Sequence, residues 1–200
     1  MDARELLCTH ARTYPAMQPC DAVKLLYQSV FGGAHMIPSP EAAKSRLLAE
    51  YESIRHDAGQ KIELLGDTAR VYIDTDMDEE QLSLLRAVFC ASARHFSRCY
   101  EKNSPASDRF EAALATLTEL CCEGVFSFTK KELASYLDAY FAAGCPAVSH
   151  SEAYRAAYAP AYRVIDAKFV RILPLIGVIS RAMQKTSPLV VAIDGRCASG

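Results

Sequence analysis

The sequence predicts a mainly α-helical fold with a small β-hairpin at about residues 61–74. Most segments combine a helix-capping residue with apolar residues at helical spacing, and strand-like runs are few. Half of the 200 residues are hydrophobic, which suffices for a sizeable core. The run "LVVAI" near the end is typical of a strand buried on both faces. We therefore expect a multi-helical domain over 1–186, and over 187–200 a C-terminal strand belonging to a truncated α/β domain.

Three helices are expected in the first quarter of the chain. Two of them should cover about residues 2–14 and 20–31. The third, "SPEAAKSRLLAEYESI", starts with Ser39 as N-cap and Pro40 at the first helical position. A serine at the N-cap accepts a hydrogen bond from a free backbone amide, and the fixed φ of proline suits the first turn. The Ser-Pro pair therefore predicts where this helix begins.

The predicted hairpin lies between the third and the fourth helix. The segments "KIELL" and "ARVYIDT" carry strand-forming residues and are separated by Gly66 and Asp67, a pair that favours a tight turn. The fourth helix, "DEEQLSLLRAVFCASARHF", begins at Asp78 with Gln81 three residues later, as in a capping box. We expect no other strand before the end of the chain.

Four more helices are expected after residue 100. "SPASDRFEAALATLTELCCEG" repeats the Ser-Pro start. "TKKELASYLDAYFAAG" opens with the capping box Thr129/Glu132, and "SHSEAYRAAYA" with Ser149/Glu152. "AKFVRILPLIGVISRAMQ" is apolar enough for a buried helix, although Pro174 should kink it or make it start late.

Composition and charge exclude several classes of partner. The formal net charge of −2 gives no basic field for nucleic acid. No apolar run reaches the roughly 18 residues that a membrane span needs, and the N-terminus lacks the features of a signal peptide. We therefore expect a cytoplasmic protein with no membrane partner. None of the eight cysteines lies in a CxxC spacing, so we assign no metal ligands and expect buried thiols.

The last residues match the beginning of a phosphate-binding loop. The pattern is G-x-x-x-x-G-K-[S/T] after a strand, and its glycines let backbone amides point at phosphate oxygens. The candidate loop residues are Asp194, Gly195, Arg196, Cys197, Ala198, Ser199 and Gly200. The lysine and the Ser/Thr would be positions 201 and 202. We therefore expect a chain that is not catalytically competent, with no catalytic residue of its own and no bound cofactor.

The stretch "VVAIDGRCASG" resembles the start of the kinase domain of the uridine kinase family and its P-loop relatives. That resemblance implies ATP-dependent phosphorylation, with ATP and Mg²⁺, of a nucleoside or a similar hydroxyl compound by the parent protein. It makes residues 1–186 an accessory or regulatory domain whose partner is the rest of the kinase domain. The segments "LLYQSVFGGAHMI" and "SHSEAYRAAYAPAYRVI" resemble regions upstream of the kinase domain in uncharacterised, uridine-kinase-like bacterial proteins.

Two regions of the helical domain are candidates for ligand binding. His35 follows Gly32-Gly33 in a loop, where it is a candidate ligand-binding or acid/base group. The second region surrounds the predicted helix start in "SHSEAYRAAYAPAYRVI", where arginines and tyrosines suit phosphate or carboxylate recognition. Its candidates are His150, Arg155, Tyr162 and Arg163. The two regions form one site only if His35 and His150 converge.

Two alternatives to the accessory-domain interpretation stay open. The helical domain could be a stand-alone module that binds a small anion or a nucleotide through the His35 loop and the region of His150, Arg155 and Arg163. It could also be a dimerisation or scaffold domain, acting as a homodimer. Fold class alone does not separate these functions.

Overall fold

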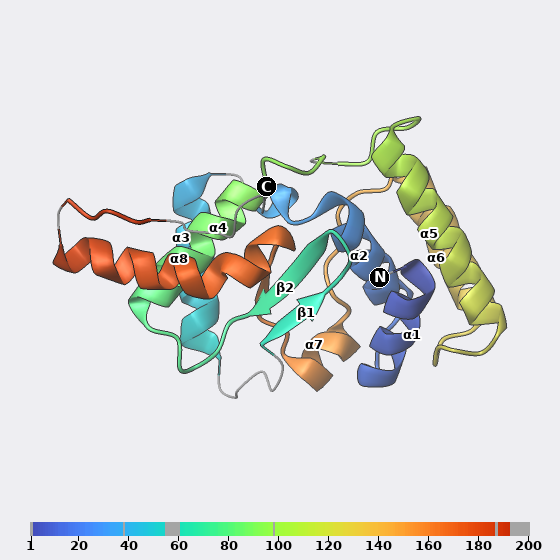
Figure 1. Cartoon of the computed structure of the whole chain (residues 1–200). Coiled ribbons are helices and arrows are strands. Elements are labelled where there is room, and N and C mark those ends of the chain that lie inside the picture. Colours follow the sequence, from blue (N-terminus) through green and yellow to red (C-terminus); the bar gives the residue numbers. More distant parts are fainter. Residues whose placement is uncertain (1, 38, 55–60, 98, 187, 193–200) are drawn as a thin grey trace.

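The computed structural model describes residues 2–37, 39–54, 61–97, 99–186 and 188–192. It confirms the mainly helical fold with a small β element (Figure 1). In chain order the elements are α1 (Ala3–Thr13), α2 (Pro19–Phe31), the 3-10 turn η1 (Ala34–Met36), α3 (Pro40–Ser53), β1 (Ile62–Leu64), β2 (Thr68–Tyr72), α4 (Glu79–Ser92), α5 (Pro105–Cys122), α6 (Lys130–Ala142), α7 (Glu152–Tyr158), β3 (Tyr162–Asp166) and α8 (Lys168–Lys185).

The predicted hairpin is present as two strands of a three-stranded antiparallel sheet with the order β1-β2-β3. In β1 and β2, Glu63 lies opposite Arg70. The third strand, β3, was not expected from the sequence. It pairs along the whole of β2, from Thr68 opposite Asp166 to Tyr72 opposite Tyr162. Strand β3 is therefore about 90 residues away in sequence from β2, its neighbour in the sheet, and no local turn connects the two strands.

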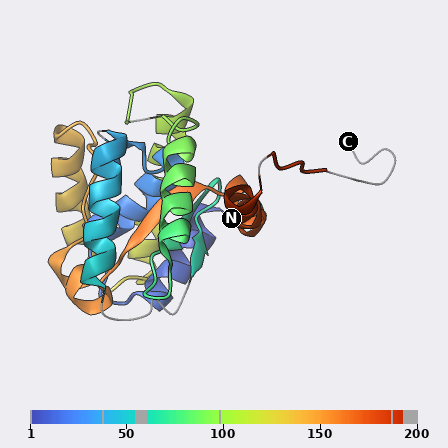
Figure 2. The same cartoon turned by 90° about the vertical axis from the view of Figure 1, so that its left-hand side faces the viewer.

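Helices cover both faces of the sheet (Figures 1 and 2). On one face Ala69, Val71 and Ile165 pack in a cluster with Leu82 and Phe89 of α4, and residues of α3 and α8 contribute to the same cluster. The opposite face turns toward α1, α2 and α7. Because successive side chains of a strand point to opposite faces, each strand supplies residues to both layers.

The larger apolar core lies between α1, α2, α5 and α6, beside the second face of the sheet. It includes Leu7, Leu25, Phe31, Phe110 and Leu117, all of them fully buried. Helix α2 is buried around most of its circumference, because α5 and α6 cover one side of it and β2 the other. Polar residues of α2 are therefore held between the core and the sheet, where they need internal partners.

Most of the predicted helix starts are confirmed. The side chains of Ser39, Asp78, Ser104 and Thr129 each accept a hydrogen bond from a backbone amide three residues later. The start of α7 differs from the prediction. Its N-cap is Ser151 rather than Ser149, because the Ser151 hydroxyl accepts from the Tyr154 amide.

Helix α8 also differs from the expectation. It begins at Lys168, before Pro174, so the proline does not delay the start of the helix. Pro174 stays exposed inside a helix that continues to Lys185. The proline removes one intrahelical hydrogen bond. Packing of Phe169 and Leu173 against the α4 cluster accompanies the continued helix.

The prediction of a C-terminal strand is wrong for the part of it that the structure describes. Residues 189–192 form no strand, and Val190 is 86% exposed. A strand needs a hydrogen-bonded neighbour, and a strand buried on both faces also needs helical cover. The described sheet is formed by β1, β2 and β3. Residues 193–200, including all seven candidates for the phosphate-binding loop, lie outside the described residues.

The glycine pair at the end of α2 has two separate structural roles. Gly32 has a φ of +61°, which favours glycine, and ends the helix through a hydrogen bond from its amide to the Gln28 carbonyl. Gly33 has no unusual φ, but a Cβ on it would lie 2.7 Å from Cε2 of Phe89. The pair therefore turns the chain and lets it approach α4 closely.

Replacement of Gly33 by alanine is expected to lower the free energy of unfolding by about 1–3 kcal/mol, because the buried ring of Phe89 must move. Gly177→Ala is the matched control: its new Cβ would lie 3.6 Å from Leu84, an ordinary contact, in a helix that favours alanine. Urea denaturation of both variants measures the difference. Equal stability of Gly33→Ala and the wild type would contradict this reading of the contact.

Candidate functional site

A charged side chain is completely buried in the middle of the sheet. Arg70 of β2 has an exposed fraction of 0%. Its Nε and Nη2 donate to Oε1 of Gln28 at 3.0 and 2.7 Å, and its Nη1 donates to Oε2 of Glu63 at 3.1 Å. The guanidinium also lies 4.5 Å from the centre of the Tyr162 ring. A buried cation requires such partners, because its loss of hydration is otherwise uncompensated.

The hydrogen bonds of Arg70 determine which nitrogen of His10 carries a proton. Arg70 Nη1 lies 3.4 Å from Nε2 of His10, and arginine can only donate, so Nε2 is an acceptor. The proton is therefore on Nδ1, which donates to Oε1 of Glu63 at 2.8 Å. Burial lowers the pKa of His10, so this imidazole is neutral. Burial opposes ionisation of Glu63, but the His10 hydrogen bond and the Arg70 charge outweigh it and lower the pKa of Glu63 to about 2.

A second chain of hydrogen bonds joins the start of α7 to the sheet. Nδ1 of His150 lies 2.9 Å from Oδ1 of Asp21, and Nε2 lies 2.6 Å from the Tyr162 hydroxyl. Burial lowers the pKa of His150 to about 4, although the Asp21 hydrogen bond acts in the opposite direction. His150 is therefore neutral near pH 7, with its proton directed at Asp21, and the Tyr162 hydroxyl donates to Nε2. The Tyr162 oxygen also lies 3.2 Å from Oε1 of Gln28, a contact between two acceptor oxygens once the Tyr162 proton is directed at His150, and here the two chains come close to each other.

Asp21 anchors this second chain. It accepts from the backbone amide and the hydroxyl of Ser151 at 3.0 and 2.6 Å, and from the Gln18 amide at 2.9 Å. Burial raises its pKa, but these hydrogen bonds and the one from His150 leave the pKa of Asp21 below its usual value. One carboxylate therefore caps α2 and attaches the first turn of α7 to it.

The buried network opens onto a cleft of about 520 Å³. The Tyr72 hydroxyl at its floor donates to Oε2 of Glu63 at 3.1 Å and lies 3.0 Å from the Tyr14 hydroxyl. Tyr154 and Tyr158 contribute a wall, with their ring centroids 5.4 and 5.0 Å from that of Tyr14. The cleft is lined by Tyr14, Glu50, Ser53, Ile54, Tyr72, Ile73 and the stretch Tyr154–Ala161.

Arg155 supplies positive charge to this cleft. Its side chain is exposed, and no ion pair joins it to a carboxylate in the described ranges. Burial raises the pKa of both Tyr14 and Tyr72, so their hydroxyls stay protonated near neutral pH. The lining also contains the Glu50 carboxylate, which is paired with Arg163. A concave site with aromatic walls, fixed hydroxyls and a free guanidinium suits a small anionic molecule.

The structure divides the predicted cluster of His150, Arg155, Tyr162 and Arg163. His150 and Tyr162 do come together, but they are buried behind the cleft, while Arg155 lines it. Arg163 lies on the other face of the sheet, where its Nη1 donates to Oε2 of Glu50 at 2.6 Å. Successive side chains of a strand point to opposite faces of the sheet, so Tyr162 and Arg163 of β3 lie on different faces. The sequence did not predict this separation, because β3 itself was not predicted.

His35 does not join the site around His150. It lies on η1 with its ring 5.4 Å from that of Tyr27, in an edge-to-face arrangement. Burial lowers the pKa of His35 to about 4, and its buried Nδ1 has no hydrogen-bond partner among the described residues. No described hydrogen bond or ring contact connects His35 with His150. Its position is that of a packed side chain against α2.

Sequence reasoning missed the centre of the network, which consists of His10, Gln28, Glu63 and Arg70. One signal was available for two of them. Glu63 and Arg70 are equally distant from the Gly66-Asp67 turn, so the predicted hairpin already places them opposite each other. The burial of this pair depends on α1 and α2, which are remote in sequence.

The comparisons with known proteins leave the function to be argued from this geometry. Neither the family models, nor the curated proteins, nor the solved structures contain a match to the chain. Over the described ranges, no group of three His, Cys, Asp or Glu side chains is placed to hold a metal ion. The helices described for this chain include none that is both long and apolar enough to cross a membrane.

Proposed function

We propose that this helical domain binds a small anionic molecule in the cleft bordered by α3, α7, β2 and the end of α1. The observation that carries the proposal is that Arg155, a guanidinium without an ion-pair partner in the described ranges, lines the same cleft as Tyr14 and Tyr72, whose hydroxyls are held by hydrogen bonds. Arginine binds phosphate and carboxylate groups with strong, charge-assisted hydrogen bonds. The cleft volume of about 520 Å³ lies within the range of small-molecule sites.

The buried network supports the binding site by holding its floor rigid. Tyr72 is fixed by Glu63, and Glu63 is fixed by Arg70 and His10. A site whose polar groups are already oriented loses less conformational entropy when a ligand binds. This is a role for the buried charges that hydrophobic residues could not fill, because a hydrophobic residue cannot orient a hydroxyl.

Titration calorimetry with uridine 5′-monophosphate, glycerol 3-phosphate and inorganic phosphate tests the proposal. We expect binding by at least one of the organic phosphates, weakened about tenfold or more in Arg155→Ala because a charge-assisted hydrogen bond is lost. Arg109→Ala is the matched control, since Arg109 is exposed, pairs with Asp67 and does not line the cleft. Absence of binding, or equal binding by Arg155→Ala and the wild type, would refute this function.

A second proposal concerns the protein in which this domain acts. The resemblance of "VVAIDGRCASG" to the start of uridine kinase-like domains favours an accessory or regulatory role for residues 1–186 in an ATP- and Mg²⁺-dependent phosphotransferase. Sequencing the gene downstream of the codon for Gly200 tests this role directly. A lysine codon followed by a serine or threonine codon would support it, and a stop codon would exclude it.

A further inference from the structure

The hydrogen bonds at the floor of the cleft determine which atoms a ligand meets there. Glu63 is ionised, so it can only accept hydrogen bonds, and the Tyr72 hydroxyl must donate to it. At the 3.0 Å contact between the two hydroxyls, the proton therefore comes from Tyr14. The single proton of the Tyr14 hydroxyl is used inside the protein, so toward a ligand in the cleft that Tyr14 lines, its oxygen can only accept.

The hydroxyl of the neighbouring Tyr154 also contacts the buried network. The Tyr154 hydroxyl lies 3.3 Å from Nε2 of His10, whose single lone pair it shares with Nη1 of Arg70, because the proton of this neutral imidazole is on Nδ1. The Tyr154 hydroxyl therefore also donates its hydrogen bond to the buried network. Tyr158 is the opposite case: its oxygen accepts from the Ala16 amide at 2.8 Å, so its own proton stays available. The cleft thus combines acceptor oxygens near Glu63 with a donor on Tyr158 and the cation of Arg155.

We infer that the ligand is a hydroxylated or amino-bearing anion, such as a polyol phosphate or a nucleotide. Its anionic group meets Arg155, and its O–H or N–H groups donate to the Tyr14 oxygen. An anion that has only acceptor atoms finds no hydrogen-bond donor at the floor of the cleft, because the hydroxyls of Tyr14 and Tyr72 already donate within the buried network. This inference rests on the proposed binding function and restricts the class of ligand within it.

Two phosphates of the same carbon number separate the two claims. Glycerol 3-phosphate carries two hydroxyl groups, and propyl phosphate carries none, so the inference predicts that the first binds about five- to tenfold more tightly, as expected for one or two hydrogen bonds. Chemical-shift titration of the isotope-labelled chain measures both affinities, including weak ones. The Tyr14→Phe variant removes the acceptor oxygen and should bring the two affinities together, while Arg155→Ala should weaken both.

The outcomes distinguish a failure of this inference from a failure of the proposed function. Equal affinities of the two phosphates in the wild type, both dependent on Arg155, would overturn the inference and leave anion binding in place. No binding of either compound at millimolar concentration, together with none of the nucleotide, would remove the proposed function as well. Tyr158→Phe is a matched tyrosine control, which removes a donor from the wall and should preserve the preference for glycerol 3-phosphate.

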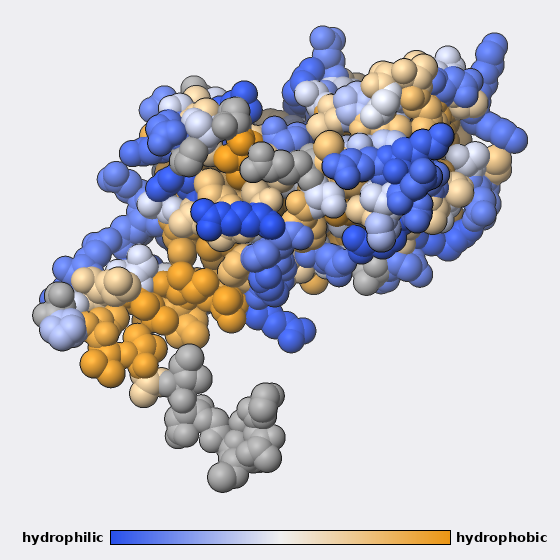
Figure 3. All heavy atoms as spheres, turned by 90° about the horizontal axis from the view of Figure 1, so that it is seen from above, coloured by the Kyte–Doolittle hydropathy of each residue, from blue (hydrophilic) through white to orange (hydrophobic). Residues whose placement is uncertain are grey.

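A separate observation concerns α8, whose outer side carries an apolar stripe. Leu175, Val178 and Met183 are 56, 56 and 63% exposed, whereas Gly177 on the opposite side is buried near Leu84 of α4. Apolar atoms of α8 and of residues 189–192, which follow it, gather in the orange area at the lower left of Figure 3. A contiguous apolar patch of this kind on a helix is typical of a protein contact. Between Val178 and Met183 on this side of the helix, Ile172, Leu175, Ile179 and Ala182 recur at intervals of three and four residues, as in the seam of paired helices.

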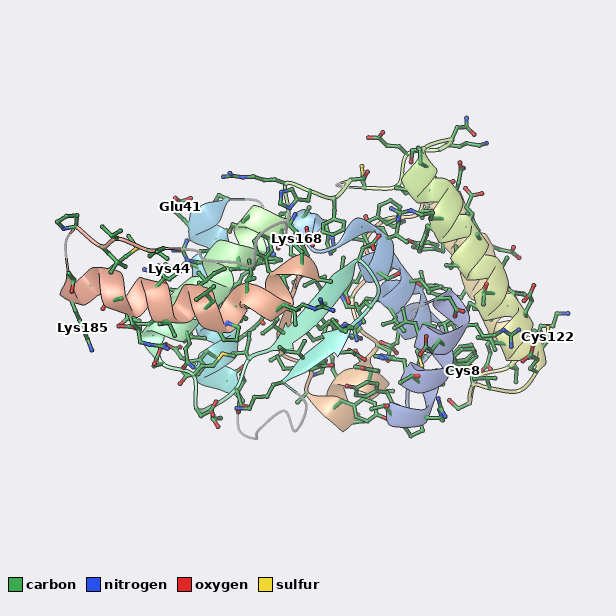
Figure 4. All side chains as sticks on the ribbon, in the orientation of Figure 1. Cys8, Glu41, Lys44, Cys122, Lys168 and Lys185 are labelled. Atoms are coloured by element: carbon green, nitrogen blue, oxygen red, sulfur yellow. The ribbon has the colours of Figure 1, made fainter. Side chains whose placement is uncertain are left out.

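The charges beside the stripe indicate what kind of helix fits it. Between Lys168 and Lys185, the two ends labelled in Figure 4, α8 contains four basic residues and no acidic one. Arg171, Arg181 and Lys185 form no ion pair with the described residues. An antiparallel pair of α8 helices would place Arg171 close to Lys185 of the second copy, and like charges at such positions oppose pairing. Trp and Tyr, which are enriched at membrane interfaces, are absent from α8, and this favours a protein partner over an anionic membrane surface.

We propose that α8 docks an amphipathic helix of another protein that carries acidic residues beside its apolar seam. A labelled synthetic helix of about three heptads, with leucine at the seam and glutamate beside it, is the probe; a matched peptide carries lysine instead of glutamate. Fluorescence anisotropy should show binding of the acidic peptide alone. Arg171→Glu/Lys185→Glu should reverse this preference, and Leu175→Ser/Val178→Ser should abolish binding.

Leu64→Ser serves as the control variant for the α8 stripe, because Leu64 is 48% exposed on β1 and lies outside the stripe. It should bind the acidic peptide as the wild type does. Equal binding of both peptides would overturn the charge argument. Dimerisation of the chain in sedimentation, lost in Leu175→Ser/Val178→Ser, would assign the stripe to a second copy instead. Binding of the chain to phosphatidylserine vesicles through the same residues would also overturn the proposal.

Discussion

Replacement of Arg70 by methionine is expected to lower the free energy of unfolding by about 3–5 kcal/mol, the range for removing one partner of a buried ion pair. The side chain is fully buried, and its removal leaves the Glu63 carboxylate and Oε1 of Gln28 without their strongest donors. Methionine has a similar length and fills most of the space, so the loss reports the uncompensated polar groups rather than a cavity. Urea denaturation at pH 7 measures the change.

A double-mutant cycle separates the ion pair from the rest of the network. Glu63→Gln removes the negative charge and keeps one oxygen, which can accept from Tyr72 or from His10 but not from both, because these donors use different oxygens of Glu63. In the double variant Arg70→Met/Glu63→Gln, no buried carboxylate is left unpaired, so the combined loss should be clearly smaller than the sum of the two single losses. Arg109→Ala, which breaks an exposed pair, should change the stability by no more than about 1 kcal/mol. An Arg70→Met variant as stable as Arg109→Ala would contradict the assigned role of Arg70.

Acidification is expected to destabilise the fold between pH 6.5 and pH 4 through His150. Burial lowers the pKa of His150 to about 4, whereas an unfolded chain has the ordinary value of about 6.5. As the pH falls through this window, the unfolded state takes up a proton and the folded state does not, so stability decreases with falling pH. The full difference corresponds to about 3 kcal/mol, present above pH 6.5 and lost by pH 4.

The variant His150→Gln isolates this contribution. Glutamine keeps a donor for Asp21 and an acceptor for Tyr162 but does not titrate, so its stability at pH 7 should fall while its decrease between pH 6.5 and 4 becomes smaller than in the wild type. His10 and His35, whose pKa values burial also lowers, keep part of the slope in the variant. The contribution of Glu63 to stability is lost in a lower pH window. Its pKa is about 2 in the folded chain, so protonation of Glu63 destabilises the fold only below about pH 4.5.

Denaturation curves at pH 7.0, 6.0, 5.0 and 4.5 provide the measurement. His95→Gln is the control, because the His95 side chain is 46% exposed. It should leave the pH dependence close to that of the wild type. If His150→Gln keeps the full wild-type slope, the imidazole of His150 is not buried in its neutral form, and the assigned proton positions of the second hydrogen-bond chain are wrong.

Local signals in the sequence predicted the helices well because a helix start depends on residues within one turn. The capping boxes at Asp78/Gln81 and Thr129/Glu132 each form as expected, with reciprocal hydrogen bonds between side chain and backbone. The start of α7 shows the limit of this reasoning. Ser149 and Ser151 both suit an N-cap by type, and the contact with Asp21 of α2 accompanies the use of Ser151.

Long-range contacts decided what the sequence pattern left undetermined in the sheet. The run "AYRVID" is short, has no turn residue that pairs it with a neighbour, and becomes β3 only because β2 is available to it. Once β3 forms, alternation sends Tyr162 to the buried network and Arg163 to Glu50 on the opposite face. Two residues that are adjacent in sequence therefore have different roles, and the predicted cluster divides.

By itself, the sequence determined the helical class, the hairpin and most helix boundaries, because these depend on hydrogen bonds and spacing within a few residues. It also placed Arg155 among the ligand-binding candidates, although not the cleft that Arg155 lines. Only the tertiary structure decided that Arg70, Glu63, His10 and Gln28 share one buried site, since they come from α1, α2, β1 and β2. The physical reason is that a buried charge is tolerated only where partners from distant segments meet it, and no local pattern records where those segments will pack.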